Sequence, residues 1–341
     1  MLFAVIAILI LSCCGGCSAR GSYSAKQKVT DLTEEYNKKV AQRFATQSPQ
    51  AAPSHAETTA VTQPAPVQTP QREVVTVAVK RRPNAIGVII GNKDYARYNN
   101  GIPDVSYAQR DAQAVRDMFI YRLGIDKDNI IYVEDATQAA LFAIFGTKKN
   151  YKGKLYNWVK PHQSEVFVYY SGHGAPSISG KNAYLVPVDS STSYLAETGY
   201  PLDTLYANIA KLPSVDNVVI IDSCFSGDSP SGMLFKNVSP ALLKEASHVE
   251  RIQRSCVISS TSVGELSNWY PAKEHSLFTY YLLEAMSGKA DTNNDHKITV
   301  AEIKKYVDGE VPYKARRLSG REQHPVFVVD NDNRVLVAPA K

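Results

Sequence analysis

The sequence predicts one α/β domain with a mostly parallel central sheet flanked by helices on both faces. Short, continuous runs of Val and Ile recur between residues 85 and 260, and amphipathic segments separate them. Strands of parallel sheets are buried on both faces and form such runs, with crossover helices between them. A long stretch poor in large apolar residues precedes residue 74 and is predicted to stay outside this domain.

The elements of this domain follow from hydrophobic periodicity. Expected strands cover residues 85–90, 130–133, 166–170, 218–221 and 256–259. Expected helices cover residues 105–119, part of 141–159, and 277–286. Near the end of the chain, the apolar segments 326–329 and 334–337 flank Asp330-Asn331-Asp332-Asn333, which predicts a β-hairpin.

The first 17 residues are typical of a leader. Leu2 to Leu11 is an apolar run that is too short to span a bilayer and has the length of a signal-peptide core. The cysteines that follow resemble a bacterial lipobox, which makes Cys13 or Cys17 the predicted lipidation site. A plain secretory signal or a short membrane anchor is the alternative. We therefore expect a protein of the bacterial cell envelope, either anchored as a lipoprotein on the periplasmic or surface face or secreted.

Residues 18–73 are predicted to form a stalk and linker. Apolar residues recur at helical spacing over residues 26–44, which indicates an amphipathic helix that could self-associate or remain a partly formed stalk. Residues 46–72 contain five prolines among Ala, Gln and Thr, a composition typical of an extended linker. The folded domain is therefore expected over residues 74–341.

Charge and cysteine content exclude several classes of protein. The chain has 38 Lys and Arg against 33 Asp and Glu, a net charge of +5 without long basic runs, so nucleic acid is not an expected partner. Only Cys224 and Cys256 lie in the foldable part, too few for a disulfide framework. Cys256 lies inside an apolar strand and is expected to be a small core residue.

Two expected strands end in residues that can carry chemistry. The strand at 166–170 runs into Ser171-Gly172-His173-Gly174, and the strand at 218–221 runs into Asp222-Ser223-Cys224. In open parallel sheets, functional groups gather at these carboxyl ends. His173 is the predicted general base, Cys224 the predicted nucleophile, and the backbone N–H groups of Gly174 and Cys224 the predicted oxyanion donors. This chemistry requires no cofactor.

These motifs resemble the caspase-like cysteine peptidases, the peptidase C14 domain, and in particular bacterial metacaspase-like members. His173 precedes Cys224 by about 50 residues, a spacing typical of that group. The resemblance extends over residues 84–330 and includes the segments Ile90–Tyr95 and Leu185–Asp189. It implies a caspase-like fold and a cysteine endopeptidase. Alternatives are a catalytically idle caspase-like scaffold or a purely structural lipoprotein.

The residue before Ser223-Cys224 bears on the expected substrate. Metacaspases carry Asp-Ser-Cys here and cut after Arg or Lys, whereas animal caspases carry Gln-Ala-Cys and cut after Asp. Asp222 and Asp111, which matches a second acidic position of metacaspases, are therefore predicted to bind a basic P1 side chain. Phe225 departs from the His that often follows the metacaspase cysteine. In the alternative view, both aspartates order loops.

A segment with the ligand spacing of an EF-hand begins at Asp291. The predicted metal ligands are Asp291, Asn293, Asp295, Thr299 and Glu302. His296 replaces the usual glycine of the sixth loop position, and a metal-free turn that caps the next helix is the alternative. If the loop binds calcium, the resemblance implies a structural or activating role.

Self-cleavage is also predicted, because basic residues follow the nucleophile and relatives are often nicked in this region. The candidate sites are Lys236, Lys244, Arg251 and Arg254.

Overall fold

The computed structural model describes residues 79–98, 101–176, 183–225, 228–229, 232–233, 254–262 and 264–339. All of them belong to the second of two compact units, residues 73–341. The predicted leader with Cys13 and Cys17, the helix at 26–44 and the linker at 46–72 lie outside the described residues. Among the residues that are described, none of the helices has the length and apolarity to cross a membrane.

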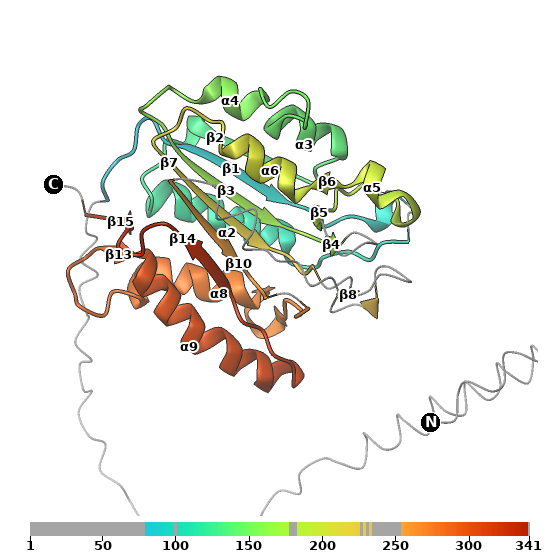
Figure 1. The fold of residues 1–341 in the computed structure, drawn as a ribbon. Helices are drawn as coiled ribbons and strands as arrows, with labels where there is room; N and C mark the ends of the chain where they lie inside the picture. Colours follow the sequence, from blue (N-terminus) through green and yellow to red (C-terminus); the bar gives the residue numbers. More distant parts are fainter. Residues whose placement is uncertain are drawn as a thin grey trace, which may run out of the picture. The chain divides into compact units, whose positions relative to one another are not determined.

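A six-stranded sheet forms the centre of the described part (Figure 1). Its strands are β1 (Ile86–Gly91), β2 (Ile130–Glu134), β3 (Glu165–Ser171), β7 (Asp216–Asp222), β10 (Ser255–Ser259) and β14 (Val326–Val329). They are ordered β14-β10-β7-β3-β1-β2, and every neighbouring pair is parallel except β10 with β14. The strands β3 and β7, which lead into the two predicted motifs, are neighbours at the centre of the sheet.

Helices cover both faces of the sheet (Figure 1). One face is packed against α2 (Ala108–Tyr121), α8 (Leu277–Glu284) and α9 (Val300–Ser319). The other is packed against α3 (Gln138–Phe145), α4 (Lys154–Trp158) and α6 (Leu202–Ile209). The predicted fold class, a mostly parallel sheet between two helical layers, is confirmed.

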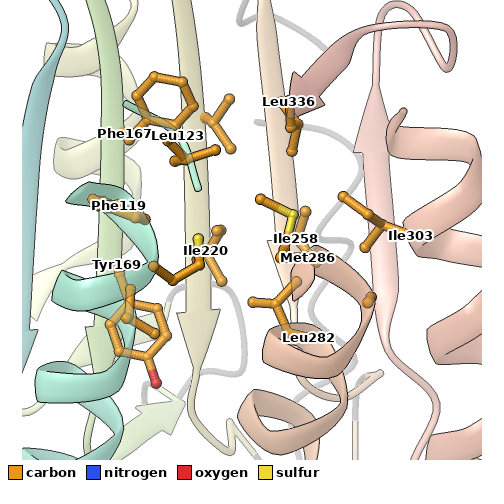
Figure 2. Packing of buried hydrophobic residues seen from close by; sticks show 14 of the residues in the cluster. Phe119, Leu123, Phe167, Tyr169, Ile220, Ile258, Leu282, Met286, Ile303 and Leu336 are labelled. Atoms are coloured by element: carbon orange, nitrogen blue, oxygen red, sulfur yellow. The ribbon is translucent and has the colours of Figure 1, made fainter. Parts of the chain in front are cut away.

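Alternation along the strands assigns side chains to the two cores. In β3, Phe167 and Tyr169 face the layer of α2 and α8, whereas Val168 and Tyr170 face the layer of α3 and α6. Figure 2 shows part of the first core, where Phe167 and Tyr169 pack near Phe119 of α2. Burying a side chain of this size stabilises the fold by roughly 1.5–3 kcal/mol.

Several local signals define where the helices begin and end. The Thr137 hydroxyl accepts a hydrogen bond from the Ala140 N–H at the start of α3, and Gly146 ends that helix with a φ of 82°. At the start of α9, Thr299 and Glu302 form a reciprocal capping box. These side chains satisfy backbone groups that a helix end leaves unpaired.

Smaller elements surround the main sheet. They comprise the three-stranded sheet β4 (Gly174–Pro176), β5 (Ala183–Leu185) and β6 (Tyr200–Pro201), and the pairs β8 (Asp228–Ser229) with β9 (Gly232–Met233), β11 (Trp269–Tyr270) with β12 (His275–Ser276), and β13 (Ile298–Thr299) with β15 (Val335–Val337). The other helices of the described residues are α5 (Leu195–Thr198), 3₁₀ turns at Ala96–Tyr98, Lys127–Asn129, Thr192–Tyr194 and Pro271–Lys273, and a π-helix at Ala285–Lys289.

The predicted C-terminal hairpin is wrong. The segment at 326–329 pairs with β10 as the edge strand of the main sheet, and Val335–Val337 pairs with β13 instead. The residues between them do form a turn, in which the Asn331 side chain accepts from the Asn333 N–H. The Asp and Asn residues of this segment determine only that the chain turns here. The strands with which the flanking segments pair depend on which strands of the folded domain still have an unpaired edge. The helix predicted within 141–159 is present as α3, and a second short helix, α4, follows it in the same region.

Candidate active site

The two predicted motifs meet at the carboxyl edge of the sheet. Ser171, the last residue of β3, is paired in register with Asp222, the last residue of β7. The Gly172 N–H then donates to the Asp222 carbonyl oxygen, which keeps the two chains together beyond the strands. His173 and Cys224 each lie two residues beyond these paired positions. The parallel register therefore brings together two segments about 50 residues apart, as the sequence predicts.

His173 is buried and held on three sides. Its ring Nε2 lies 2.7 Å from the Pro103 carbonyl oxygen, and its backbone N–H donates to the Tyr95 hydroxyl. Its own carbonyl oxygen accepts from the Tyr170 hydroxyl. A carbonyl oxygen only accepts hydrogen bonds, so the ring contact places the proton on Nε2 and leaves the lone pair on Nδ1. Burial lowers the pKa of His173 from 6.5 to about 4, so the ring is neutral at pH 7.

Gly174 lets the histidine segment touch the cysteine segment. A Cβ atom at this position would lie 2.5 Å from the Ser223 Oγ, 2.6 Å from the Phe225 ring and 2.7 Å from the Cys224 carbonyl oxygen. Real Cβ atoms do not approach other atoms so closely. The glycine beside His173 is therefore required by a close approach of two backbones, in agreement with its predicted position at a site.

Cys224 lies in a position unlike that of Cys256. Neither forms a disulfide. Cys256 is fully buried in β10, and burial raises the pKa of its thiol to about 12, as expected of a core residue. Cys224 lies beyond the end of β7 and lines a pocket with His173. The Ser267 N–H lies 2.7 Å from the Cys224 Sγ, so a backbone donor already faces the sulfur.

A small pocket of about 30 Å³ opens between these segments. Its walls are Val105, Ser171, Gly172, His173, Asp222, Ser223, Cys224, Ser267, Trp269 and Ser276. The hydroxyls of Ser171 and Ser223 are buried and have no hydrogen-bond partner among the described residues. Unpaired buried hydroxyls are unfavourable, and each of these can both donate and accept a hydrogen bond.

Asp222, the first of the two predicted substrate-binding acids, lies in the pocket wall. Its Oδ1 accepts from the Ser267 hydroxyl at 2.9 Å, and its Oδ2 accepts from the Thr279 hydroxyl at 2.6 Å. Burial raises the pKa of Asp222, and hydrogen bonds from Thr279 and Ser267 act in the opposite direction. The Asp222 carboxylate is therefore buried, and each of its two oxygens accepts a hydrogen bond from a hydroxyl group.

Asp111, the second predicted acid, is fully buried and is not among the residues that line this pocket. Its Oδ1 lies 2.5 Å from the His275 Nδ1, and its Oδ2 accepts from the Ser276 N–H. Burial raises the pKa of Asp111 to about 6, and the charge of Asp222 acts in the same direction. Of the two predicted substrate-binding acids, Asp222 therefore lines the pocket. Asp111 instead forms hydrogen bonds with β12, whose Ser276 is part of the pocket wall.

Comparison with known proteins identifies the family. The family model of the caspase domain, peptidase C14, matches residues 84–336 of the sequence. This chain belongs to the caspase domain family. Among solved structures, it is similar to a structural-genomics target from Geobacter sulfurreducens (18% identity, TM-score 0.49, covering 72% of this chain and 93% of that one). It is also similar to caspase-1 from Spodoptera frugiperda (13% identity, TM-score 0.48, covering 81% and 96%). No curated protein matches it.

Three residues of this caspase domain support the site although no pattern in the sequence predicted them. Ser267 contacts both Cys224 and Asp222, and Thr279 contacts Asp222 from the start of α8. Gln323, fully buried, accepts from the Asn268 N–H and donates to the Ser260 carbonyl oxygen. Each belongs to a segment far along the chain from His173 and Cys224, so only the folded structure joins them to the site.

The predicted metal loop of the caspase domain uses its oxygens within the chain. Asp291 and Asn293 accept from backbone N–H groups of residues 295–296, and the Glu302 carboxylate accepts from the N–H and hydroxyl of Thr299. Within the described residues, no group of three or more His, Cys, Asp or Glu side chains could hold a metal ion. His296 does adopt a left-handed conformation, with a φ of 60°, at the position where an EF-hand has glycine.

Proposed function

We propose that this caspase domain is a cysteine endopeptidase in which Cys224 is the nucleophile and His173 the general base. The observation that carries this proposal is the direct contact of the two segments through Gly174 at the carboxyl edge of β3 and β7. The contact between His173 Nε2 and Pro103 supports the same roles, because it leaves Nδ1 as the proton acceptor of the ring.

In the proposed reaction, Nδ1 of His173 takes the thiol proton as the Cys224 sulfur attacks the scissile carbonyl carbon. The backbone N–H groups of Gly174 and Cys224 are the proposed donors to the resulting oxyanion. Collapse of the intermediate breaks the C–N bond, and the imidazolium gives its proton to the leaving amine. A water molecule then gives a proton to His173 and attacks the thioester, which releases the acid and restores the thiol. Burial lowers the pKa of His173, so the ring is neutral and able to accept the thiol proton at pH 7.

For the substrate, we propose cleavage after Arg or Lys. Among the described residues, Asp222 is the one acidic side chain in the pocket wall, and the buried His173 in the same wall is neutral at pH 7. A carboxylate pairs with a guanidinium or ammonium group and repels an aspartate side chain. At about 30 Å³ the pocket has room for one or two water molecules, so a basic side chain enters only if the pocket walls move apart.

Two further predictions remain part of the proposal. Self-processing would occur after basic residues that follow the nucleophile; of these, only Arg254 lies in the described part, immediately before β10. A Cys224→Ala protein that fragments like the wild type would show that another enzyme makes these self-processing cuts.

Anchoring to a membrane through the N-terminal leader would place the enzyme at the bacterial cell envelope.

Calcium modulation also remains a proposal. The ligand spacing from Asp291 to Glu302 and the left-handed conformation of His296 support it. Binding would require Glu302 to exchange its hydrogen bonds with Thr299 for the metal.

Paired fluorogenic peptides that differ only at P1 test the proposed activity. We expect turnover of the Arg and Lys peptides by the wild type and loss of turnover in Cys224→Ala and in His173→Ala. Faster cleavage of an Asp peptide would contradict the proposed specificity. Unchanged turnover in Cys224→Ala would contradict the proposed nucleophile.

A further inference from the structure

We propose that Thr279 is a specificity-determining positioning residue, which fixes the orientation of the Asp222 carboxylate for a planar basic group of the substrate. This inference rests on the proposed function, in which Asp222 binds the P1 side chain. Thr279 lies in the first turn of α8 and is fully buried. Its Oγ1 lies 2.6 Å from the Asp222 Oδ2, shorter than most neutral hydrogen bonds between oxygens.

The hydroxyl of Thr279 has a defined direction. Its Oγ1 also lies 2.7 Å from the hydroxyl oxygen of Tyr169, which is fully buried in β3. The single Thr279 hydrogen is donated to Asp222, so Tyr169 must donate to Thr279. Burial raises the pKa of Tyr169, so this donor keeps its proton. The bonds run in one direction, from Tyr169 through Thr279 to Asp222, and each polarises the next.

The start of α8 reinforces this contact. No side chain caps its first turn, so the orphan N–H groups there are available to other acceptors. The Ser276 N–H donates to Asp111, and the backbone of Thr279 lowers the pKa of Asp222. A helix N-terminus stabilises nearby carboxylates. One helix start therefore contacts both predicted substrate-binding acids, although only Asp222 lies in the pocket wall.

The two oxygens of Asp222 are held by different donors. Thr279 bonds Oδ2, and the Ser267 hydroxyl bonds Oδ1. The Ser260 side chain and the Thr279 backbone also act on this carboxylate. Few of its about four acceptor positions therefore remain for a ligand, and the surrounding donors restrict their directions. A guanidinium binds a carboxylate through two parallel N–H bonds in one plane, whereas an ammonium group adapts to many directions. Loss of the Thr279 hydroxyl should therefore harm Arg recognition more than Lys recognition.

The alternative is that Thr279 only fills space in the core beside Tyr169. Three variants separate the two roles. Thr279→Val keeps the shape and removes the hydroxyl, Thr279→Ser keeps the hydroxyl and removes the methyl group, and Tyr169→Phe removes only the donor behind Thr279. Tyr169→Phe also keeps the test decisive if Thr279→Val folds poorly. Asp222→Asn serves as the control for the specificity carboxylate itself.

The experiment measures kcat and KM of the full chain on matched peptides with Arg, Lys or citrulline at P1. Citrulline has the shape of Arg without its charge. We expect Thr279→Val to lose about tenfold or more in kcat/KM for Arg, less for Lys, and little for citrulline, mostly through KM. Thr279→Ser should stay close to the wild type, and Tyr169→Phe should show a smaller loss in the same direction. The acid limb of the Arg profile should move to higher pH in Thr279→Val, because Asp222 loses a hydrogen bond that lowers its pKa.

Equal losses for all three peptides in Thr279→Val, with an unmoved acid limb, would overturn the inference and leave Thr279 as a packing residue. That result leaves the proposed function intact if Asp222→Asn still abolishes the preference for Arg over citrulline. If the wild type does not prefer Arg or Lys to citrulline, or if Asp222→Asn changes nothing, the proposed specificity fails, and the role of Thr279 fails with it.

Discussion

The imidazole Nε2 of His173 lies 2.7 Å from the backbone carbonyl oxygen of Pro103. This single contact fixes the ring orientation and the tautomer, because a carbonyl oxygen can only accept. No side-chain carboxylate is needed as a third member of the site. We propose that the backbone of the segment before α2 orients His173 instead, through a contact that depends on the fold and not on a motif.

The neutral state of His173 is directly measurable. Burial lowers its pKa from 6.5 to about 4, so the unfolded chain binds a proton in this interval that the folded protein does not. The free energy of unfolding should therefore fall as the pH is lowered from 6.5 to about 4. NMR titration of labelled imidazoles, with the signal assigned through His173→Gln, should give a midpoint near 4. A midpoint near 6.5 would contradict the desolvation of the ring by burial.

Gly174→Ala tests the contact between the histidine and cysteine segments. The added methyl group would meet the Cys224 carbonyl oxygen and the Ser223 hydroxyl, so the segments must separate. We expect kcat/KM to fall about a hundredfold, with a loss of stability of roughly 1–3 kcal/mol. Gly309→Ala is the control, since a Cβ there meets nothing within 4 Å and lies inside α9. It should keep full activity and gain about 0.5–1 kcal/mol. Full activity in Gly174→Ala would refute the contact.

Gln323→Ala tests the support of the pocket wall. Its amide satisfies the Asn268 N–H and the Ser260 carbonyl oxygen, both of which would be left unpaired. We expect a loss of about 2–3 kcal/mol in chemical denaturation and a lower kcat/KM, because Ser267 shifts relative to Cys224. The exposed Gln113 is the matched control, and Gln113→Ala should change stability by less than about 0.5 kcal/mol. Equal effects of the two substitutions would show that the buried amide is dispensable.

The sequence predicted the parallel sheet and the placement of His173 and Cys224 beyond the ends of two of its strands. Buried Val and Ile runs and their glycine-flanked ends are local features, which explains this. The sequence did not predict Thr279, Ser267 or Gln323, since a lone Thr, Ser or Gln has no pattern that distinguishes it from a surface residue. The hairpin prediction failed for a related reason. The turn at residues 330–333 is encoded locally, but the pairing of β14 with β10 depends on an open edge of the sheet.

Calcium titration by calorimetry tests the loop from Asp291 to Glu302. If the loop binds the ion, the wild type gives heat and Asp291→Ala does not. The ligand change also has to release the Thr299 capping box, so bound calcium should alter hydrogen exchange at the start of α9. Absence of heat in the wild type removes the metal site and leaves the acidic residues as turn and helix-capping groups.

Alkylation of the full chain by a peptidyl-arginine chloromethyl ketone, followed by peptide mapping, tests most directly whether Cys224 is the nucleophile. In this reaction the Cys224 sulfur displaces chloride and forms a stable thioether. We predict stoichiometric labelling of Cys224 in the wild type, slow labelling in His173→Ala and protection by a competing Arg peptide. Failure of a folded wild-type protein to be labelled, or a label on Cys256 alone, would contradict the assignment of Cys224 as the nucleophile. Either result would favour a caspase-like scaffold without catalysis.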